Sequence, residues 1–443
     1  MILLLFFVKI ISHLSQFIIP MLHQNPPKYS FNHQKIIIIA LAYVGVITGA
    51  GLSSGQEIFQ YFASFGKMGM IGVVILGILH AIFGGIILAL GSFYRANEHS
   101  QVLDNIAGPW VTKLLDWSLI ISGFTLGFVM IAGAGANLNQ EFGAPTWLGA
   151  ALCSLLVIGI SMLNFEKVTA AIGIFTPIVV FIIFALTLYT FVGKSYDWDY
   201  LDRIASSEPK IFPNAWLSLI NYYALCIMTG ASMAFVLGGK TMYVGEAARG
   251  GFLGGALIGL ISACTAFTIF ANIDLILDAD LPMQLLVANV HPWLGTLMSF
   301  IIFAMIFNTA ISLYYSLAKR FSGDDNQRFK WILIGLVLVG FVLSFAGFKK
   351  LVSIMFPIIG YIGMLLLIVL SLAWIKNHKK IKTERINRRH IYALMQKKLD
   401  DSQSFNKTDE KQLNQLIENS VINDQEIKQD MTQLVKDNLD KSQ

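Results

Sequence analysis

Ten apolar stretches, each about as long as a membrane-spanning helix, occupy most of the 443-residue sequence. Such a helix needs roughly 20 mainly apolar residues to cross the hydrocarbon core of a bilayer. Only 13% of the residues are charged, about half of the share in a soluble protein. We therefore predict an all-α polytopic membrane protein, and the composition excludes a soluble enzyme or a nucleic-acid-binding domain as the main body. The predicted spans are 36–65, 69–94, 114–136, 147–163, 167–192, 214–239, 247–271, 292–318, 330–346 and 350–375.

The ten spans form two matching sets of five. Adding about 178 to the limits of the first five nearly reproduces the limits of the last five. Because five is odd, the second set enters the membrane from the opposite side, which is the pattern of an inverted repeat. Glycines recur at matching places in the second and seventh spans, where they permit close helix packing. The predicted segments are an N-terminal segment at 1–35, a first repeat at 36–192, an extracytoplasmic loop at 193–213, a second repeat at 214–375 and a tail at 376–443.

The distribution of Lys and Arg predicts a protein of the cell membrane with both termini in the cytoplasm, because cytoplasmic loops are enriched in these residues. In that orientation the cytoplasmic connections and the start of the tail carry 18 Lys and Arg, against six on the other side. The N-terminal segment is either interfacial or the product of a start codon upstream of the true one.

The tail changes its charge along its length. Residues 376–398 carry nine basic residues and one acid, which suits contact with anionic lipid. Residues 399–443 are acidic, with apolar residues at helical spacing. This pattern favours an amphipathic helix for docking or self-association, and a solvated extension is the alternative.

The first span contains the run Gly45–Glu57, in which four glycines and three hydroxyl residues fall within eleven positions. Such a composition disfavours an unbroken helix, so we expect unwinding near 49–53. Unwound backbone at membrane depth is tolerated only where it is buried in protein or lines a water-filled cavity. The residues predicted to bind a solute here are Gly49, Ala50, Gly51, Ser53, Ser54 and Glu57.

Glu57 is the only acid well inside an apolar span, which points to a proton acceptor or a partner for a solute amine. The alternative is a capping box over residues 54–57 that restarts the helix. In the matching sixth span we expect a weaker break near Thr229–Ser232. That span adds four residues to the predicted solute site, Tyr222, Thr229, Gly230 and Ser232.

The run Gly45–Glu57 resembles the first helix of the YkvI-like bacterial membrane proteins. The five-plus-five arrangement resembles the LeuT fold of the amino acid, polyamine and organocation transporter superfamily, over about residues 36–375. The resemblance implies a sodium site formed by carbonyls of Gly45 and Thr48 with side chains of Asn308 and Thr309. Sodium sites of this type usually have two adjacent hydroxyl residues in the eighth helix, where this sequence has Asn308 and Thr309. Proton coupling through Glu57 or His80 is therefore the alternative.

The function expected from the sequence is secondary active transport of a small organic solute, an amino acid or an amine, by alternating access. The alternative is a receptor or sensor that keeps the fold and signals through the tail. An enzyme is not expected, since no cluster of His, Asp and Glu and no nucleophile with a base is found. We expect no bound cofactor beyond a coupling sodium ion or proton, and no nucleic-acid partner.

Overall fold

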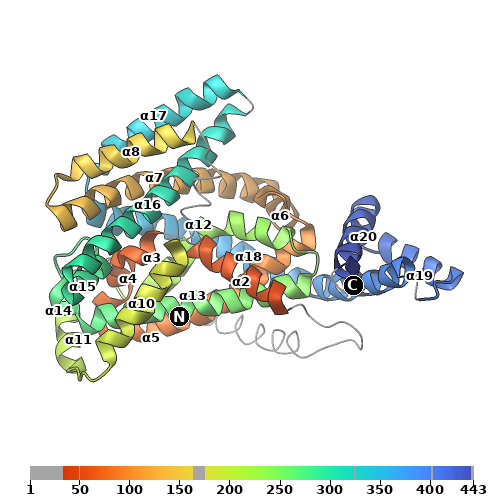
Figure 1. Ribbon diagram of the computed structural model, residues 1–443, viewed down its shortest axis with the longest axis horizontal. Helices are drawn as coiled ribbons and strands as arrows, with labels where there is room; N and C mark the ends of the chain where they lie inside the picture. The colour runs from red at the N-terminus through yellow and green to blue at the C-terminus, as the bar shows by residue number, and fades with distance from the viewer. Residues whose placement is uncertain (1–32, 49, 163–174, 324, 401–402, 441–443) are drawn as a thin grey trace.

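The computed structural model describes residues 33–48, 50–162, 175–323, 325–400 and 403–440, and all regular structure within them is helical (Figure 1). The predicted N-terminal segment lies almost entirely outside these residues. The membrane-spanning region and the short helices beside it comprise α2 His33–Ile47, α3 Ala50–Ser54, α4 Gln56–Tyr61, η1 Ala63–Phe65, α5 Gly66–Tyr94, α6 His99–Ile106, α7 Pro109–Phe142, α8 Thr146–Ser161, α10 Phe175–Phe191, α11 Trp198–Ser207, α12 Ala215–Gly239, α13 Val244–Ala271, α14 Ile273–Ile276, α15 Pro282–Val290, α16 Pro292–Ser322, α17 Asn326–Ser344 and α18 Phe348–Leu399. The tail adds α19 Lys407–Glu418 and α20 Asp424–Asp440.

Among the described residues, seven helical stretches are long and apolar enough to cross a membrane. The helices α2, α8 and α10 are apolar but shorter. Together they match the ten predicted spans, so the all-α polytopic fold is confirmed. The predicted loop 193–213 contains the additional helix α11.

The spans pack in two groups of four. The helices α2, α5, α12 and α13 contact one another, and so do α7, α8, α16 and α17. The interface of α5 and α13 is built from the matching glycines: Gly77 lies against Gly259, and Gly84 lies against Gly251. These glycines let the two backbones approach closely, which agrees with their predicted role.

Gly255→Ala is expected to lower the free energy of unfolding by about 1 to 3 kcal/mol, since overpacking of a tight core forces the backbone to move. A Cβ at Gly255 would overlap the backbone of His80. The matched control is Gly335→Ala in α17, where nothing lies within 4 Å of the added Cβ, and it should be neutral or stabilising because alanine favours the helix. Thermal unfolding of the purified protein measures both, and equal melting temperatures would contradict the packing role.

The first predicted span is interrupted twice. α2 ends at Ile47 and α3 begins at Ala50, so the predicted helix is interrupted before Ala50, and Gly49 itself lies outside the described residues. The unwinding expected over 49–53 is wrong for residues 50–53, which are helical in α3. Gly55 separates α3 from α4 with a φ of 78°, a left-handed conformation that glycine adopts without strain. The predicted capping box is wrong, because Gly55 is the N-cap and no side chain caps α4. Ser54 instead accepts a hydrogen bond from the Gln56 amide (3.3 Å).

The sixth predicted span is not broken. α12 is continuous from Ala215 to Gly239, so the break expected near Thr229 is wrong. The Thr229 hydroxyl donates to the Cys226 carbonyl of the same helix (3.0 Å), so the helix accommodates this residue. Gly230 lies against α2, where a Cβ would overlap Ile47. The glycine therefore permits close packing and does not unwind the helix.

The tail begins without a break, because α18 continues from the tenth span to Leu399. Arg388 on this extension is fully buried in protein, and Arg385 and Arg389 are also buried. The predicted contact of this basic stretch with lipid is therefore wrong for Arg388, whose charge is used within the protein.

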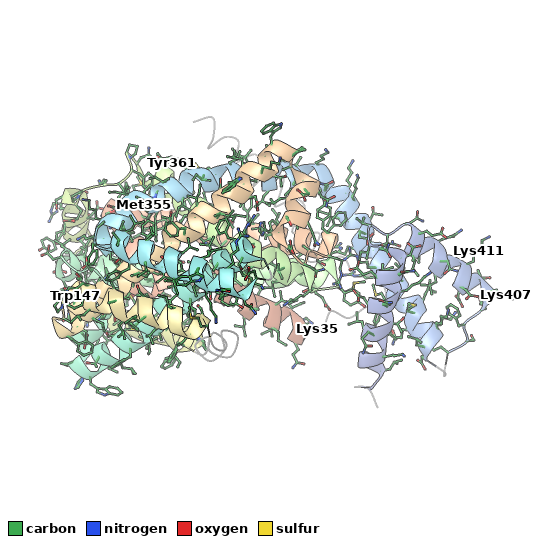
Figure 2. The ribbon with its side chains drawn as sticks, turned by 90° about the horizontal axis from the view of Figure 1, so that it is seen from above. Lys35, Trp147, Met355, Tyr361, Lys407 and Lys411 are labelled. Atoms are coloured by element: carbon green, nitrogen blue, oxygen red, sulfur yellow. The ribbon has the colours of Figure 1, made fainter. Side chains whose placement is uncertain are left out.

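The tail hairpin, which we define as residues 403–440 with α19 and α20, folds against the end of α18 at one end of the molecule (Figures 1 and 2). Lys407 and Lys411 lie at its far end, away from the spans (Figure 2). Its apolar core includes Met242 and Tyr243 from the connection between α12 and α13. The apolar periodicity of the sequence therefore corresponds to docking on the same chain. We call the membrane face at which the hairpin lies the tail side.

Candidate solute-binding cavity

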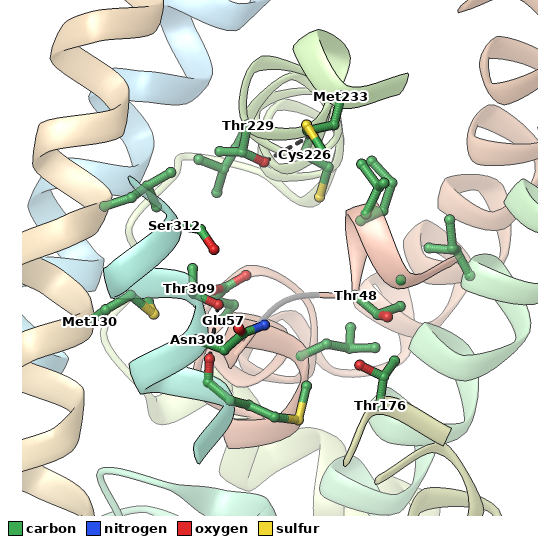
Figure 3. Close-up of a pocket in the computed structure, with 18 of the residues that line it drawn as sticks. Thr48, Glu57, Met130, Thr176, Cys226, Thr229, Met233, Asn308, Thr309 and Ser312 are labelled. Carbon is green, nitrogen blue, oxygen red and sulfur yellow. Dashed lines mark hydrogen bonds between the residues drawn. The ribbon is translucent and has the colours of Figure 1, made fainter. Parts of the chain in front are cut away.

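A cavity of about 410 Å³ lies between the two helix groups, where the first span is interrupted. Figure 3 shows Thr48 and Thr176 on one side of it, and Asn308, Thr309 and Ser312 on the other, with Glu57 between them in this view. Its apolar walls include Leu126 and Met130 of α7 and Phe356 of α18. Its polar lining consists of Thr48, Glu57, His80, Thr176, Tyr222, Cys226, Thr229, Ser262, Asn308, Thr309 and Ser312.

Glu57 is the only carboxylate among the described lining residues, and none of them is Lys or Arg. The turn at Gly55 places it in the first turn of α4. Its Oε2 accepts a hydrogen bond from the Tyr222 hydroxyl of α12 (3.2 Å). A carboxylate at membrane depth is costly without a positive partner, so the cavity favours a cation next to Glu57.

α16 contributes a second polar wall. Asn308, Thr309 and Ser312 share one face of this helix, since residues one turn apart lie on the same side. The Thr309 hydroxyl donates to the Met305 carbonyl (3.0 Å) and keeps its lone pairs for a ligand. Asn308 Oδ1 is buried and has no hydrogen-bond partner in the described part of the chain. An unpaired buried acceptor of this kind calls for a donor or a cation.

α2 and α5 also contribute polar groups to the lining. Gly45 and Thr48 line the cavity at the end of α2, and the Thr48 hydroxyl donates to the Val44 carbonyl (2.7 Å). His80 of α5 also lines the cavity, and its ring packs edge-on against Tyr223 with 4.9 Å between ring centroids. All four residues of the expected sodium site therefore line one cavity together with Glu57.

The cavity is open toward the tail side. α12 runs toward that side, and along it the exposed fraction rises from 3% at Tyr222 to 61% at Met233, both of which line the cavity. At the other end, Phe356 is 1% exposed. The walls therefore separate toward the tail side and close at the opposite end.

Polar contacts hold α15 in place at the closed end of the cavity. Gln140 of α7 donates to the Leu281 carbonyl (3.0 Å) and accepts from the Leu281 amide (2.9 Å), which holds the start of α15. Gln284 of α15 accepts from Asn137 (3.0 Å) and donates to Glu141 (3.0 Å). Glu141 also accepts from Thr296 of α16 (2.6 Å). These contacts join α7, α15 and α16.

Two proteins of Bacillus subtilis (strain 168) are similar to the chain in sequence. The uncharacterized membrane protein YkvI is 22% identical over 329 residues, which cover 74% of this chain and 92% of YkvI. The uncharacterized protein YyaD is 25% identical over 333 residues, which cover 75% of this chain and 95% of YyaD. No protein-family model matches the sequence.

Two solved structures share the fold. Mhp1 in its inward-facing conformation is 12% identical with a TM-score of 0.50, covering 78% of this chain and 77% of Mhp1. MhsT in complex with L-phenylalanine is 16% identical with a TM-score of 0.52, covering 79% of this chain and 97% of MhsT. Both have the LeuT fold. The chain is thus similar in sequence to YkvI and YyaD, and it has the LeuT fold. The family resemblance and the fold class expected from the sequence are thus confirmed.

Seven of the fourteen predicted site residues line the cavity. They are Gly45, Thr48, Glu57, Tyr222, Thr229, Asn308 and Thr309. Ser53 lines a separate hollow of about 10 Å³. Ser54 accepts from the Gln56 amide, Gly230 packs on Ile47, and Ser232 Oγ pairs with His99 Nδ1 (3.0 Å). The remaining three, Gly49, Ala50 and Gly51, fall where the structure describes no side chains.

The sequence did not indicate that Cys226, Thr176 and Met130 belong to the site. Cys226 follows Tyr222 by four residues and precedes Thr229 by three, so helical periodicity alone could have placed it on the same face. No comparable signal marks Thr176 or Met130, which come from helices that the sequence does not connect to the break.

Proposed function

We propose that the chain is a secondary active transporter of a small organic solute, an amino acid or an amine, which works by alternating access. The observation that carries the proposal is the cavity between two helix groups, polar at its centre, open toward one face and closed toward the other. A site that opens to one side at a time needs only a relative movement of the two groups. The fold supports this reading, because such movement of repeats about a central site is how these transporter folds work.

The proposed solute carries an ammonium group. Glu57 supplies the negative charge that pairs with this group. Leu126, Met130 and Phe356 provide apolar contact for the rest of the molecule. The volume of about 410 Å³ falls within the range of small-molecule pockets.

Counterflow in proteoliposomes tests the proposal. A thermal-shift screen of amino acids and amines first identifies a stabilising compound, and its labelled form is then exchanged against an unlabelled internal pool. We expect accumulation of label that an ionophore does not abolish, because exchange requires no net gradient. Binding without counterflow for every stabilising compound would contradict transport. It would favour the receptor or sensor, for which the docked tail hairpin is the supporting observation.

For coupling we propose a sodium ion held by the carbonyls of Gly45 and Thr48 and the side chains of Asn308 and Thr309. Neutral oxygens of this kind suit a hard cation. Uptake should fall when potassium replaces sodium, and Thr309→Val should raise the sodium concentration for half-maximal uptake about tenfold. Thr190→Val, at a buried threonine of α10 outside the cavity lining, is the matched control. Uptake that does not depend on the sodium concentration but stops when the proton gradient collapses would exclude this site and favour a proton as the coupling ion.

A further inference from the structure

The tail hairpin is attached to the helices that form the cavity. Arg388 of α18 donates to the carbonyls of Ser92 (2.9 Å) and Phe93 (2.8 Å) in the last turn of α5, and to the Met242 carbonyl (3.1 Å) beyond α12. The last carbonyls of a helix have no partner within the helix. Arg388 therefore binds the tail-side end of α5 and the connection that follows α12.

Glu384 links Arg388 to the hairpin. Its Oε1 accepts from Arg388 Nε (2.7 Å) and from the Ser420 hydroxyl (2.6 Å), and Oε2 accepts from the Val421 amide (3.4 Å). Ser420 and Val421 lie in the turn between α19 and α20. One buried ion pair thus joins the end of α5 to the turn of the hairpin.

Arg95 makes a second, more accessible attachment. It donates to the Gly239 carbonyl at the end of α12 (2.7 Å) and forms ion pairs with Asp430 and, at 3.8 Å, with Glu426 of α20. The Glu426 side chain is 46% exposed. Ion pairs at such positions are weakened by salt, so this attachment is sensitive to ionic strength.

The same junction reaches the other helix group. Ser232 of α12 pairs with His99 of α6, and His99 Nε2 lies 3.3 Å from Asp116 Oδ1 of α7. Asp116 in turn pairs with Arg320 at the end of α16. His99 follows Arg95 by four residues, so the segment held by the hairpin also contacts α7, which is joined through Asp116 to α16. Both α7 and α16 line the cavity from the opposite side.

We propose that the docked tail hairpin holds the protein in the state whose cavity is open toward the tail side, and that release of the hairpin lets α12 and α5 move against α7 and α16. The inference rests on the proposed function in one respect, since this movement is the step that would carry a solute across. In the structure the hairpin is docked and the tail side is open, as the proposal requires.

Electron paramagnetic resonance distances across the tail-side mouth test the proposal in the full-length protein. Spin labels replace Met233 of α12 and the exposed Ser316 of α16, which lies one turn beyond Ser312, after the three native cysteines have been changed to serine. The test variant is Asp430→Asn with Glu426→Gln, which removes both ion pairs of Arg95. The matched control is Glu410→Gln, whose ion pair with Lys398 (3.7 Å) lies within the tail.

We expect the protein with the unmodified tail to give a predominant long distance and a minor short-distance population. The double variant should raise the ratio of a short-distance population to the long one about three- to fivefold, the effect of losing two partly exposed ion pairs. Glu410→Gln should leave the distribution unchanged. Raising potassium chloride from about 50 to 500 mM should also raise this ratio in the protein with the unmodified tail, because salt weakens exposed ion pairs. The same change of salt should have less effect on the ratio in the double variant.

Met431→Asp gives an independent release, because it places a charge in the apolar core of the hairpin, where Met431 is fully buried. Trypsin cleavage after Lys428 or Lys436 reports whether the hairpin has come away. Faster cleavage with an unchanged distance distribution in both variants would overturn the proposal. The measurement needs no solute, so failure of counterflow would count against transport alone, and an unchanged distribution would count against the role of the hairpin alone.

Discussion

Replacing Arg388 by methionine is expected to lower the free energy of unfolding by about 3 to 5 kcal/mol, the usual cost of removing one partner of a buried ion pair. Glu384 is only 3% exposed and would keep its charge without the guanidinium. The carbonyls of Ser92, Phe93 and Met242 would lose their donor as well. Methionine fills much of the same volume, so the effect measures the loss of charge and hydrogen bonds.

Denaturant unfolding of the purified full chain measures the effect. Lys397→Met is the matched control, since its ion pair with Asp409 is partly exposed and lies within the tail (2.6 Å), and such pairs contribute less than about 1 kcal/mol. Adding Glu384→Gln to Arg388→Met should restore part of the stability, because the orphaned charge is then gone. A stability of Arg388→Met within error of the unmodified protein would show that α5 and the tail are held by other contacts.

Glu57→Gln is expected to weaken binding of an ammonium-bearing solute by about 30- to 100-fold, or roughly 2 to 3 kcal/mol, the size of a charge-assisted contact. Glutamine keeps the shape of the side chain and an acceptor for the Tyr222 hydroxyl, so the fold should be preserved. Isothermal titration with the solute found in the thermal-shift screen measures the effect. Asp278→Asn, at an exposed carboxylate outside the cavity, is the matched control.

An affinity of Glu57→Gln within threefold of the unmodified protein would show that the carboxylate does not hold the solute. In that case the polar face of α16, with Asn308 and Thr309, would be the remaining candidate for the ammonium group. A variant that binds normally but no longer exchanges its solute would instead place Glu57 in coupling.

The spans and the first break could be predicted from the sequence because both follow from local composition. Apolar length decides which stretches cross a bilayer, and the glycines from Gly45 to Gly55 disfavour a continuous helix whatever surrounds them. The break predicted in α12 failed for a tertiary reason. A glycine such as Gly230 is typical of a helix break, but here it permits Ile47 of α2 to pack against α12. The sequence of one span does not reveal such a contact with another helix.

The site was predictable only in part for the same reason. Glu57 stood out because a carboxylate at membrane depth is rare, and Tyr222 and Thr229 followed from the matching span. Whether a residue of such a span faces the cavity depends on helix rotation, which the neighbouring helices set. Ser232 therefore contacts His99 instead of the cavity. The burial of Arg388 had no sequence signal, since a basic stretch after a span reads as membrane-surface charge.

The unbroken length of α18 has a mechanical consequence. Its 52 residues correspond to about 78 Å at 1.5 Å per residue, more than twice the roughly 30 Å of a hydrocarbon core. Residues 376–399, nearly half of the helix, thus lie beyond the predicted tenth span and extend past the bilayer as a continuous helical rod. A tilt of the helix by a few degrees displaces the far end by several ångströms. A displacement of the projecting end therefore tilts the same helix within the membrane, including the portion that contains Phe356.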